Sequence, residues 1–359
     1  MITQSIADGT TRAWVDIDLG ALVRNGQALE RHAGVPLLPM VKADAYGLGV
    51  LPVAQALSRL GPLGFGVASI GEGAELRAGG IVTPILVFTP LLAADFPAAR
   101  AQALTPTLGD PAAIATWIDT GGGPWHLAIE TGMARAGLPW TAVGAVTDLV
   151  RRGPPAGAFT HFHSAELDDG SMEEQERRFS TAVAALPARP PLLHTQNSAG
   201  ITRRAPSPWD LVRPGVFLYG VNCGGALRSE PVAAIRSRVV ECRDIAVGES
   251  VSYGATWRAA AITRVATLAV GYADGYRRSL GNSGTVLVRG RRARVVGSVT
   301  MDMTMVDVTG IPCQTGDVAT LMGSDGDQHI GAEDVADACG LSPYEILTGL
   351  RGRLPRRYA

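Results

Sequence analysis

The sequence contains almost no lysine. Lysine and arginine together number 32, and Lys42 is the only lysine among them. Arginine does not lose its proton, so it cannot attack a carbonyl carbon, whereas a desolvated lysine can. Biased replacement of lysine by arginine would explain the scarcity but not the position, because Lys42 directly follows a nearly all-apolar run at residues 35–41. Such a run is typical of a buried strand, so we expect Lys42 to carry chemistry at the strand's end.

The chain also lacks a dominant charge, paired cysteines and long apolar segments. Its formal net charge is −1, which provides no electrostatic footprint for nucleic acid or an anionic membrane. The four cysteines show neither CxxC pairing nor metal-ligand spacing, as is usual in a reducing compartment. We recognise no signal peptide in residues 1–11 and no apolar run long enough to span a bilayer, and therefore expect a cytoplasmic protein.

Short apolar segments alternate with helical patterns over the first 220 residues. After residues 35–41, we predict strands at residues 64–68, 84–88, 103–108, 126–129, 156–161, 192–194 and 211–213. Eight strand–helix units most simply close into a (β/α)8 TIM-like barrel, and a doubly wound open sheet is the alternative. The clearest helix is predicted from Ser171, whose hydroxyl would form a capping box with Glu174.

Beyond about residue 230 the helical periodicity nearly disappears. Short β-rich runs predict a hairpin (286–288 and 293–296 around a turn at 289–292) and strands at 303–308 and 317–322, with one helix at 332–339 ended by Gly340. We therefore predict an α/β protein with two domains, a barrel over residues 12–230 and a mainly β domain over residues 231–359. The alternating residues 12–19 are expected to pair with the β domain.

Several polar groups are predicted at the ends of barrel strands. Tyr46 and two glycines follow Lys42, and glycines permit close approach of a phosphate, although an ordinary loop is an equal alternative. Ser198 follows the seventh strand, and Arg213 and Gly215 end the eighth, where barrels frequently bind phosphate. A lysine combined with phosphate loops indicates pyridoxal 5'-phosphate, whose pyridine nitrogen requires a partner that Arg213 can supply.

Nine short motifs occur in an order that matches one known family. Residues 41–49, Val-Lys-Ala-Asp-Ala-Tyr-Gly-Leu-Gly, resemble the cofactor-lysine signature of the alanine racemases. The other eight are similar to further family motifs and lie at residues 129–135, 160–162, 197–199, 213–215, 252–254, 271–275, 299–302 and 342–345. The resemblance covers nearly the whole chain. It implies a pyridoxal phosphate-dependent isomerase that interconverts L-alanine and D-alanine, works as a head-to-tail homodimer with shared active sites, and has the same barrel and β domain.

The resemblance also implies roles for individual residues. Lys42 would form an aldimine with the cofactor and act as one catalytic base, and Tyr253 of the partner subunit would act as the second. Arg213 would hydrogen-bond the pyridine nitrogen, with His161 beside it. The positions that match phosphate contacts are Tyr46, Ser198, Gly215, Val216 and Tyr344. Those that match the substrate site are Arg135, Met301, Tyr272 and Asp302, with Tyr272 and Tyr344 at the entrance gate.

These residue types suit racemisation. A proton must leave Cα on one face and return on the other, so a base is needed on each side. An arginine does not protonate the pyridine nitrogen, which we expect to suppress side reactions. The alternatives are a racemase for serine or another small amino acid, a non-catalytic pyridoxal phosphate-binding protein, and a decarboxylase of the same two-domain architecture.

Two positions depart from the family pattern. Leu48 stands where the signature usually has histidine, and Ala128 stands where many members carry a carbamylated lysine that positions the carboxylate-binding arginine. We therefore expect Arg135 to be held in another way, by Glu130 or by chloride. His161 and His163, with nearby acidic residues, have the spacing of a metal site, but the cofactor accounts for His161 and we predict no metal.

Overall fold

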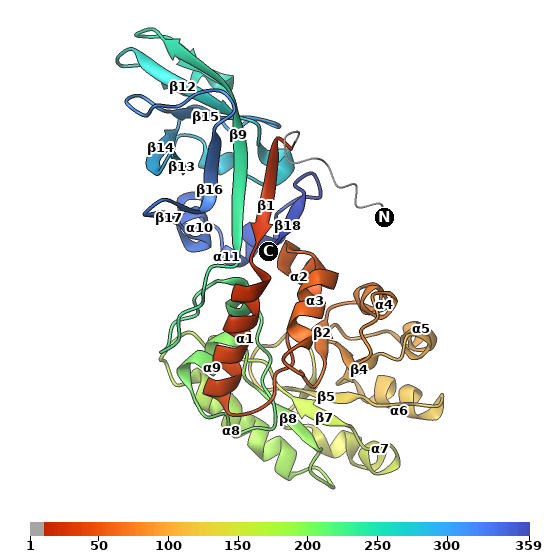
Figure 1. The fold of residues 1–359 in the computed structure, drawn as a ribbon. Coiled ribbons are helices and arrows are strands. Elements are labelled where there is room, and N and C mark those ends of the chain that lie inside the picture. The colour runs from red at the N-terminus through yellow and green to blue at the C-terminus, as the bar shows by residue number, and fades with distance from the viewer. Residues whose placement is uncertain (1–10) are drawn as a thin grey trace. The chain divides into compact units, whose positions relative to one another are not determined.

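The computed structural model describes residues 11–359. Residues 1–10, to which the expectation of no signal peptide applies, lie outside the described residues. The chain divides into two compact units (Figure 1). We call residues 20–45 and 49–230 the barrel unit, and residues 11–19, 46–48 and 231–359 the β unit.

A parallel sheet forms the centre of the barrel unit. Its neighbouring strands are β2 (Phe65–Val67), β3 (Ile85–Val87), β4 (Thr105–Leu108), β5 (His126–Glu130), β7 (Gly157–Phe159) and β8 (Leu192–His194), and β5 also pairs with β6 (Leu138–Pro139). Parallel bridges join Met40 to Gly66 and Leu37 to Val212. The Arg213 N–H donates to the Gln196 carbonyl beyond β8 at 2.9 Å. Eight parallel segments therefore close on one another, and the predicted barrel is confirmed over the open sheet.

Helices connect the strands and lie outside the sheet (Figure 1). They are α1 (Leu19–Ala33), α3 (Val50–Ser58), α4 (Ile70–Ala78), α5 (Phe96–Ala101), α6 (Pro111–Asp119), α7 (Thr147–Arg152), α8 (Ser171–Ala184) and α9 (Ser198–Arg203). Their apolar sides bury large side chains against the strands, and Phe96 meets Trp117 edge to face with ring centroids 5.1 Å apart. Such burial of apolar and aromatic surface stabilises this layer.

The predicted capping box at the start of α8 is wrong. Gly170, with φ +76°, is the residue before the helix, and the Asp169 carboxylate accepts the Ser171 N–H at 3.0 Å. Glu174 instead pairs with Arg177 at 2.7 Å, whose hydrogen bonds hold the pKa of Glu174 down to about 2. The chain enters the helix one residue earlier than the pattern indicates, because glycine readily adopts the left-handed conformation.

A long, mainly antiparallel sheet forms the β unit. The sheet order is β17 (Gln328–Ile330), β16 (Val318–Asp325), β13 (Thr285–Val288), β14 (Arg291–Val295), β15 (Thr304–Asp307), β12 (Thr263–Leu268), β9 (Ala233–Ile245), β1 (Ala13–Ile17) and β18 (Arg356–Tyr358). β10 (Ser250–Val251) and β11 (Trp257–Arg258) form a separate ribbon, and α10 (Ala332–Cys339) and α11 (Pro343–Thr348) lie in sequence between β17 and β18. β1 pairs with β9 antiparallel and with β18 parallel.

The local predictions in this unit hold with two differences. The hairpin joins β13 to β14, but its turn is only Arg289–Gly290, both with positive φ. α10 ends at Gly340 in the left-handed conformation, as predicted. Strand β9 was not predicted, because arginines alternate with its buried residues and mask the apolar pattern. One of them, Arg236, pairs with Asp16 on β1 at 2.8 Å.

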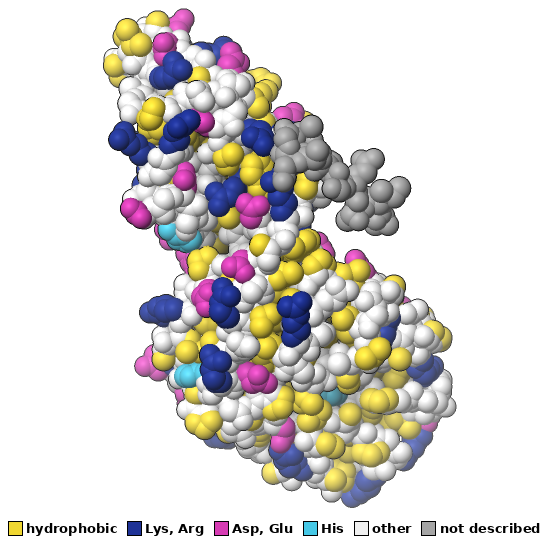
Figure 2. Space-filling view, in the orientation of Figure 1, with side chains coloured by type: hydrophobic (Ala, Val, Ile, Leu, Met, Phe, Trp, Pro, Cys, Tyr) yellow, Lys and Arg dark blue, Asp and Glu magenta, His cyan; other side chains and the backbone are white. Residues whose placement is uncertain are grey.

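Charged side chains of both signs are interspersed on the face drawn in Figure 2, and neither sign gathers into a patch there. This distribution agrees with the net charge of −1. Across residues 11–359, none of the helices combines the length and apolar character needed to cross a membrane.

Candidate active site

Lys42 begins a turn with an unusual backbone. In α2 (Lys42–Gly47), residues 43–46 all have φ between 51° and 56°, which makes the turn left-handed. This conformation costs roughly 1–2 kcal/mol for each residue that carries a Cβ. Strain of this kind persists only where surrounding contacts enforce it, and it concentrates at functional sites. The strained turn therefore marks the Lys42 segment as a site that the fold holds in place.

Glu72, near the start of α4, clamps the beginning of this turn. Its carboxylate accepts the N–H groups of Ala43 at 2.8 Å, Ala68 at 2.7 Å and Ser69 at 3.2 Å. The Ser69 hydroxyl accepts the Glu72 N–H in return, which completes a capping box. One side chain thus ties the residue after Lys42 to the end of the neighbouring strand.

The surroundings of Lys42 favour its neutral amine. The side chain is half-buried, and this burial is the largest cause of a lowered pKa. The nearby Arg135 guanidinium lowers the pKa further, and the Glu72 carboxylate opposes the shift. A neutral amine is the nucleophilic form of lysine, so this environment suits the predicted chemistry.

Arg213 is held by a ring of acceptors in the barrel. Only 2% of the residue is exposed. Nη1 donates to His194 Nδ1 at 2.7 Å and to the His194 carbonyl at 2.9 Å, and Nη2 donates to the carbonyls of Thr160 and Thr195 at 2.8 and 2.9 Å and lies 3.3 Å from His161 Nδ1. No contact of the described residues uses Nε, which therefore remains as a donor for a bound group. Burial lowers the pKa of Arg213 to about 9, so the guanidinium stays charged at neutral pH.

Two buried histidines support this arginine. Because Arg213 donates to Nδ1 of His194, neutral His194 carries its proton on Nε2, which lies 2.8 Å from Nδ1 of His126 and donates to it. The His194 ring also stacks on Phe159, with centroids 5.2 Å apart. Burial, and then the charge of Arg213, lower the pKa of His126 to about 4 and that of His161 to about 3. All of these imidazoles are neutral near pH 7.

The loops after the seventh and eighth strands meet at Ser198. The Ser198 hydroxyl, at the start of α9, accepts the N–H groups of Gly215 at 2.8 Å and Phe217 at 3.4 Å. Val216, which lies between these two residues, is buried. Two backbone donors therefore converge on one oxygen, in the way that donors converge on a phosphate.

Tyr46 and Tyr344 are brought together within the β unit. Their ring centroids lie 6.4 Å apart. The adjacent Gly47 has φ +85°, and a Cβ there would lie 2.4 Å from the Leu347 carbonyl of α11, so only glycine fits. Arg356 donates to the Gly47 carbonyl at 2.8 Å and anchors the end of the turn that begins at Lys42.

The remaining predicted residues of the β unit lie on linked turns. Tyr253 is 74% exposed, and Ser298 Oγ donates to its carbonyl at 3.1 Å. Tyr272 donates its N–H to the Thr300 carbonyl at 3.0 Å, next to Met301, which is 52% exposed. Large exposed side chains therefore gather on neighbouring turns, where they are accessible to a ligand or another chain.

The Arg135 loop is organised without a lysine at position 128. The Glu130 carboxylate accepts the backbone N–H groups of Gly132 and Arg135, the latter at 3.3 Å. Among residues 11–359 the Arg135 guanidinium has no hydrogen bond or ion pair, and it is exposed. Glu130 thus fixes the backbone of the loop and leaves the guanidinium available. The other departure, Leu48, is completely buried.

The alternative metal site is not assembled. No group of three or more His, Cys, Asp or Glu side chains in the described part of the chain could hold a metal ion. His163 contacts Ser164, and Asp168 pairs with Arg203 at 2.9 Å.

The structure therefore collects the predicted site residues into two groups. The barrel unit holds Lys42, Arg135, His161, Ser198, Arg213, Gly215 and Val216, and the β unit holds Tyr46, Tyr253, Tyr272, Met301, Asp302 and Tyr344. Sequence reasoning missed the roles of Glu72 and His126. The Ser69-x-x-Glu72 pattern was a visible capping signal for the first, but no local pattern indicates that His126 meets His194.

Comparison with known proteins matches both parts of the chain. The model of the alanine racemase N-terminal domain matches residues 17–223, and that of the C-terminal domain matches residues 232–358. An alanine racemase from Nostoc sp. is 37% identical, and the match covers 96% of this chain and 95% of that protein. The crystal structure of alanine racemase from E. faecalis superposes with a TM-score of 0.92 at 30% identity, covering 99% and 100% of the two chains.

A third comparison concerns alanine racemase from Bartonella henselae, solved with covalently bound pyridoxal phosphate. It superposes with a TM-score of 0.91 at 29% identity, covering 97% of this chain and all of that one. The family indicated by the sequence motifs is thereby confirmed: this chain belongs to the alanine racemase family.

Proposed function

We propose that this protein is an alanine racemase that uses pyridoxal 5'-phosphate to interconvert L-alanine and D-alanine. The observation that carries the proposal is the only lysine of the chain, half-buried with a lowered pKa at the end of a barrel strand. Membership of the family supports the same activity. When bound, the cofactor supplies an electron sink that makes the Cα–H bond of an amino acid acidic.

The residues present fit this cofactor. Lys42 offers an amine for its aldehyde carbon, and the buried residue Arg213 offers the Nε–H that its hydrogen bonds through Nη1 and Nη2 leave unused for its pyridine nitrogen. Ser198, Gly215 and Val216, together with the hydroxyls of Tyr46 and Tyr344, would hold the phosphate. Because Arg213 already donates to acceptors on three residues, its guanidinium is held in position before any cofactor binds.

Two side chains would move the Cα proton. Lys42 would accept or return it on one face and Tyr253 on the other, as inversion requires. Arg135, with its guanidinium unpaired within the described residues, would bind the substrate carboxylate together with the Met301–Asp302 turn. Tyr272 and Tyr344 would line the entrance. His161 would stay neutral beside the cofactor ring, because its pKa is lowered to about 3.

The active site would be shared within a head-to-tail homodimer, with Tyr253 contributed by the partner subunit. Support comes from the exposure of Tyr253 and from the division of the site residues between two units. Mixing Lys42→Ala and Tyr253→Phe subunits tests this assembly. Shared sites predict recovery of about a quarter of wild-type activity after refolding an equal mixture. Two inactive variants that remain inactive when mixed would exclude sharing.

The reaction itself is tested by the decay of optical activity. We expect purified protein with bound cofactor to bring L-alanine to the racemic value, and to act less efficiently on L-serine. Faster reaction with serine would identify the protein as a serine racemase. No reaction with any amino acid would mean that the protein binds the cofactor without racemising amino acids. We assign the enzyme to the cytoplasm, because its four cysteines are free thiols.

A further inference from the structure

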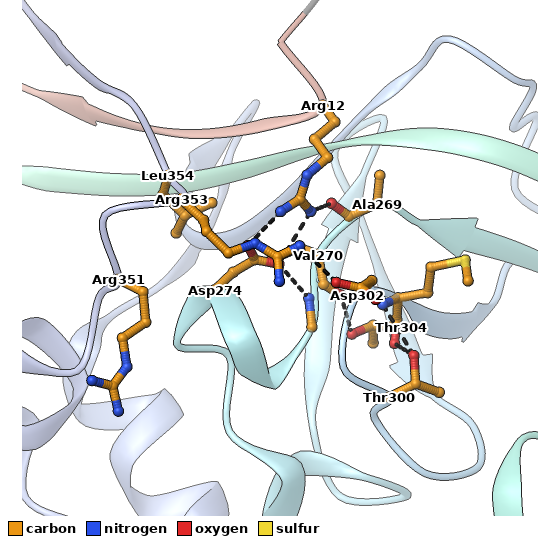
Figure 3. A network of polar contacts seen from close by, with 12 residues as sticks. Arg12, Ala269, Val270, Asp274, Thr300, Asp302, Thr304, Arg351, Arg353 and Leu354 are labelled. Carbon is orange, nitrogen blue, oxygen red and sulfur yellow. Dashed lines mark hydrogen bonds and ion pairs between the residues drawn. The ribbon is translucent and has the colours of Figure 1, made fainter. Parts of the chain in front are cut away.

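A buried carboxylate organises the turns of the β unit that carry the proposed substrate residues (Figure 3). Asp274 is completely buried. Its oxygens accept two N–H groups of Arg12 at 2.5 and 3.1 Å and the backbone N–H of Gly271 at 2.9 Å. Nε of Arg353 forms an ion pair with Asp274 at 3.2 Å. Two cations compensate a single buried anion, so the cluster carries an excess of positive charge.

Arg353 also contacts a second carboxylate, that of Asp302. Its Nη2 donates to Asp302 Oδ1 at 2.6 Å while its Nε faces Asp274, and Figure 3 shows its guanidinium between the two. The hydrogen bond with Asp302 is the main cause of a raised pKa of Arg353. About half of the Asp302 side chain remains exposed, with 52% of its surface accessible, so its charge faces both the arginine and the solvent.

The two turns joined by Arg353 are also bonded directly to each other. Tyr272 and Ala273 donate their N–H groups to the carbonyls of Thr300 and Met301, both at 3.0 Å. A Cβ at Gly271 would lie 2.3 Å from the Thr300 carbonyl, so the turns approach as closely as only glycine permits. The position of Met301 is therefore coupled to that of Tyr272, and Asp302 follows Met301 immediately.

A carboxylate beside Met301 creates an electrostatic problem for the proposed substrate. The amino acid would bring its own carboxylate to this turn, and two like charges at close range repel. We propose that Arg353 is a positioning residue that neutralises Asp302 and holds it away, so that the Met301 turn can accept the substrate carboxylate. This inference rests on the proposed racemase function.

A double-mutant cycle in the cofactor-loaded enzyme tests the role. Arg353→Met should raise the KM for L-alanine by about fivefold while kcat changes less, because the pair is half-exposed and its charges are partly screened. Added salt should lower the KM of this variant. When Asp302 is already Asn, adding Arg353→Met should change KM little, and Arg353→Lys should recover part of the wild-type KM.

Arg351→Met is the matched control. Arg351 lies two residues away in the same segment, and its side chain, which points away from the cluster in Figure 3, has no hydrogen bond or ion pair within residues 11–359. This variant should keep the wild-type KM. Thermal unfolding of every variant separates a loss of folding from a loss of substrate binding.

Two results would overturn the inference. One is an equal rise in KM on adding Arg353→Met with either Asp or Asn at position 302, which would mean that Arg353 acts only on the fold. The other is an unchanged KM in Arg353→Met. If the wild-type protein itself fails to racemise alanine, the proposed function fails instead, and the two failures are distinguishable.

Discussion

Nη1 of Arg213 lies 2.7 Å from Nδ1 of His194. This contact makes neutral His194 a donor toward His126, so the hydrogen bonds run outward from the arginine along the two rings. Protonation of His194 would remove the Nδ1 lone pair that accepts the hydrogen bond from Arg213. It would also place a second positive charge beside the guanidinium. The arginine and the two histidines are therefore stable together only while both imidazoles are neutral.

The first prediction follows from these neutral imidazoles. Burial lowers the pKa of His126 from 6.5 to about 4, so between these values the unfolded chain binds a proton that the folded chain does not. Stability is therefore complete above pH 6.5 and falls as the pH is lowered toward 4. We expect the free energy of unfolding in urea to decrease between pH 7 and pH 5, with a contribution from His126 of up to about 1.4 kcal/mol per pH unit.

His126→Asn should make this decrease shallower, because asparagine does not titrate. His163→Asn, at an exposed position, is the control and should leave the slope unchanged. A slope that is the same in wild type and His126→Asn would show that His126 is not a neutral buried group.

The second prediction concerns the amine of Lys42 in cofactor-free protein. Because Lys42 is the only lysine, an amine-directed acylating reagent can modify one side chain and the N-terminus, which peptide mass spectrometry separates. Arg135 lowers the pKa of Lys42, so Arg135→Met should raise the pKa and slow the labelling at pH 8. Arg151→Met, with its exposed side chain paired to Asp148, should have no effect. Faster labelling in Arg135→Met would contradict the account.

The third prediction tests the clamp made by Glu72. Its carboxylate accepts three backbone N–H groups, and the glutamine amide of Glu72→Gln has only one oxygen to replace them. A lost charge-assisted hydrogen bond costs about 1.5–3 kcal/mol, so we expect a loss of unfolding free energy of that order and a kcat about tenfold lower. Glu75→Gln on the exposed side of the same helix is the control. Wild-type kcat in Glu72→Gln would show that the Ala43 contact does not position Lys42.

The fourth prediction concerns the loop that replaces the usual lysine. Glu130 holds the backbone of the Arg135 loop, so Glu130→Gln should raise the KM for alanine by about threefold to tenfold with a smaller change in kcat. Ala128→Gly, which alters the same strand without touching this clamp, is the comparison. An unchanged KM in Glu130→Gln would mean that Arg135 is held by other means.

Local sequence patterns predicted the fold better than the contacts that hold the site residues in place. Apolar runs and helical stripes located the barrel strands, and Gly340 marked the end of α10, because these signals depend on residues close in sequence. Strand β9 was not predicted because arginines such as Arg236 occupy its outward positions and obscure the alternation of apolar and polar residues. The His126–His194 contact and the Arg353 cluster join residues far apart in the chain, so only the folded structure brings them together.

The left-handed turn after Lys42 could not be predicted for a different reason. Its residues Ala43, Asp44 and Ala45 have no intrinsic preference for positive φ apart from the aspartate. The conformation is imposed by contacts from outside the segment, including Glu72. Sequence reasoning correctly selected the segment for its lysine but had no basis for its backbone.

The most direct test of the central claim is the circular dichroism of L-alanine and of D-alanine with wild type, Lys42→Ala and Tyr253→Phe. The account predicts that wild type brings both enantiomers to the racemic value, and that each variant is slower by a factor of at least about 100. Tyr253→Phe should retain bound cofactor, because Lys42 and Arg213 are intact. Racemisation by Tyr253→Phe at the wild-type rate would contradict the two-base account.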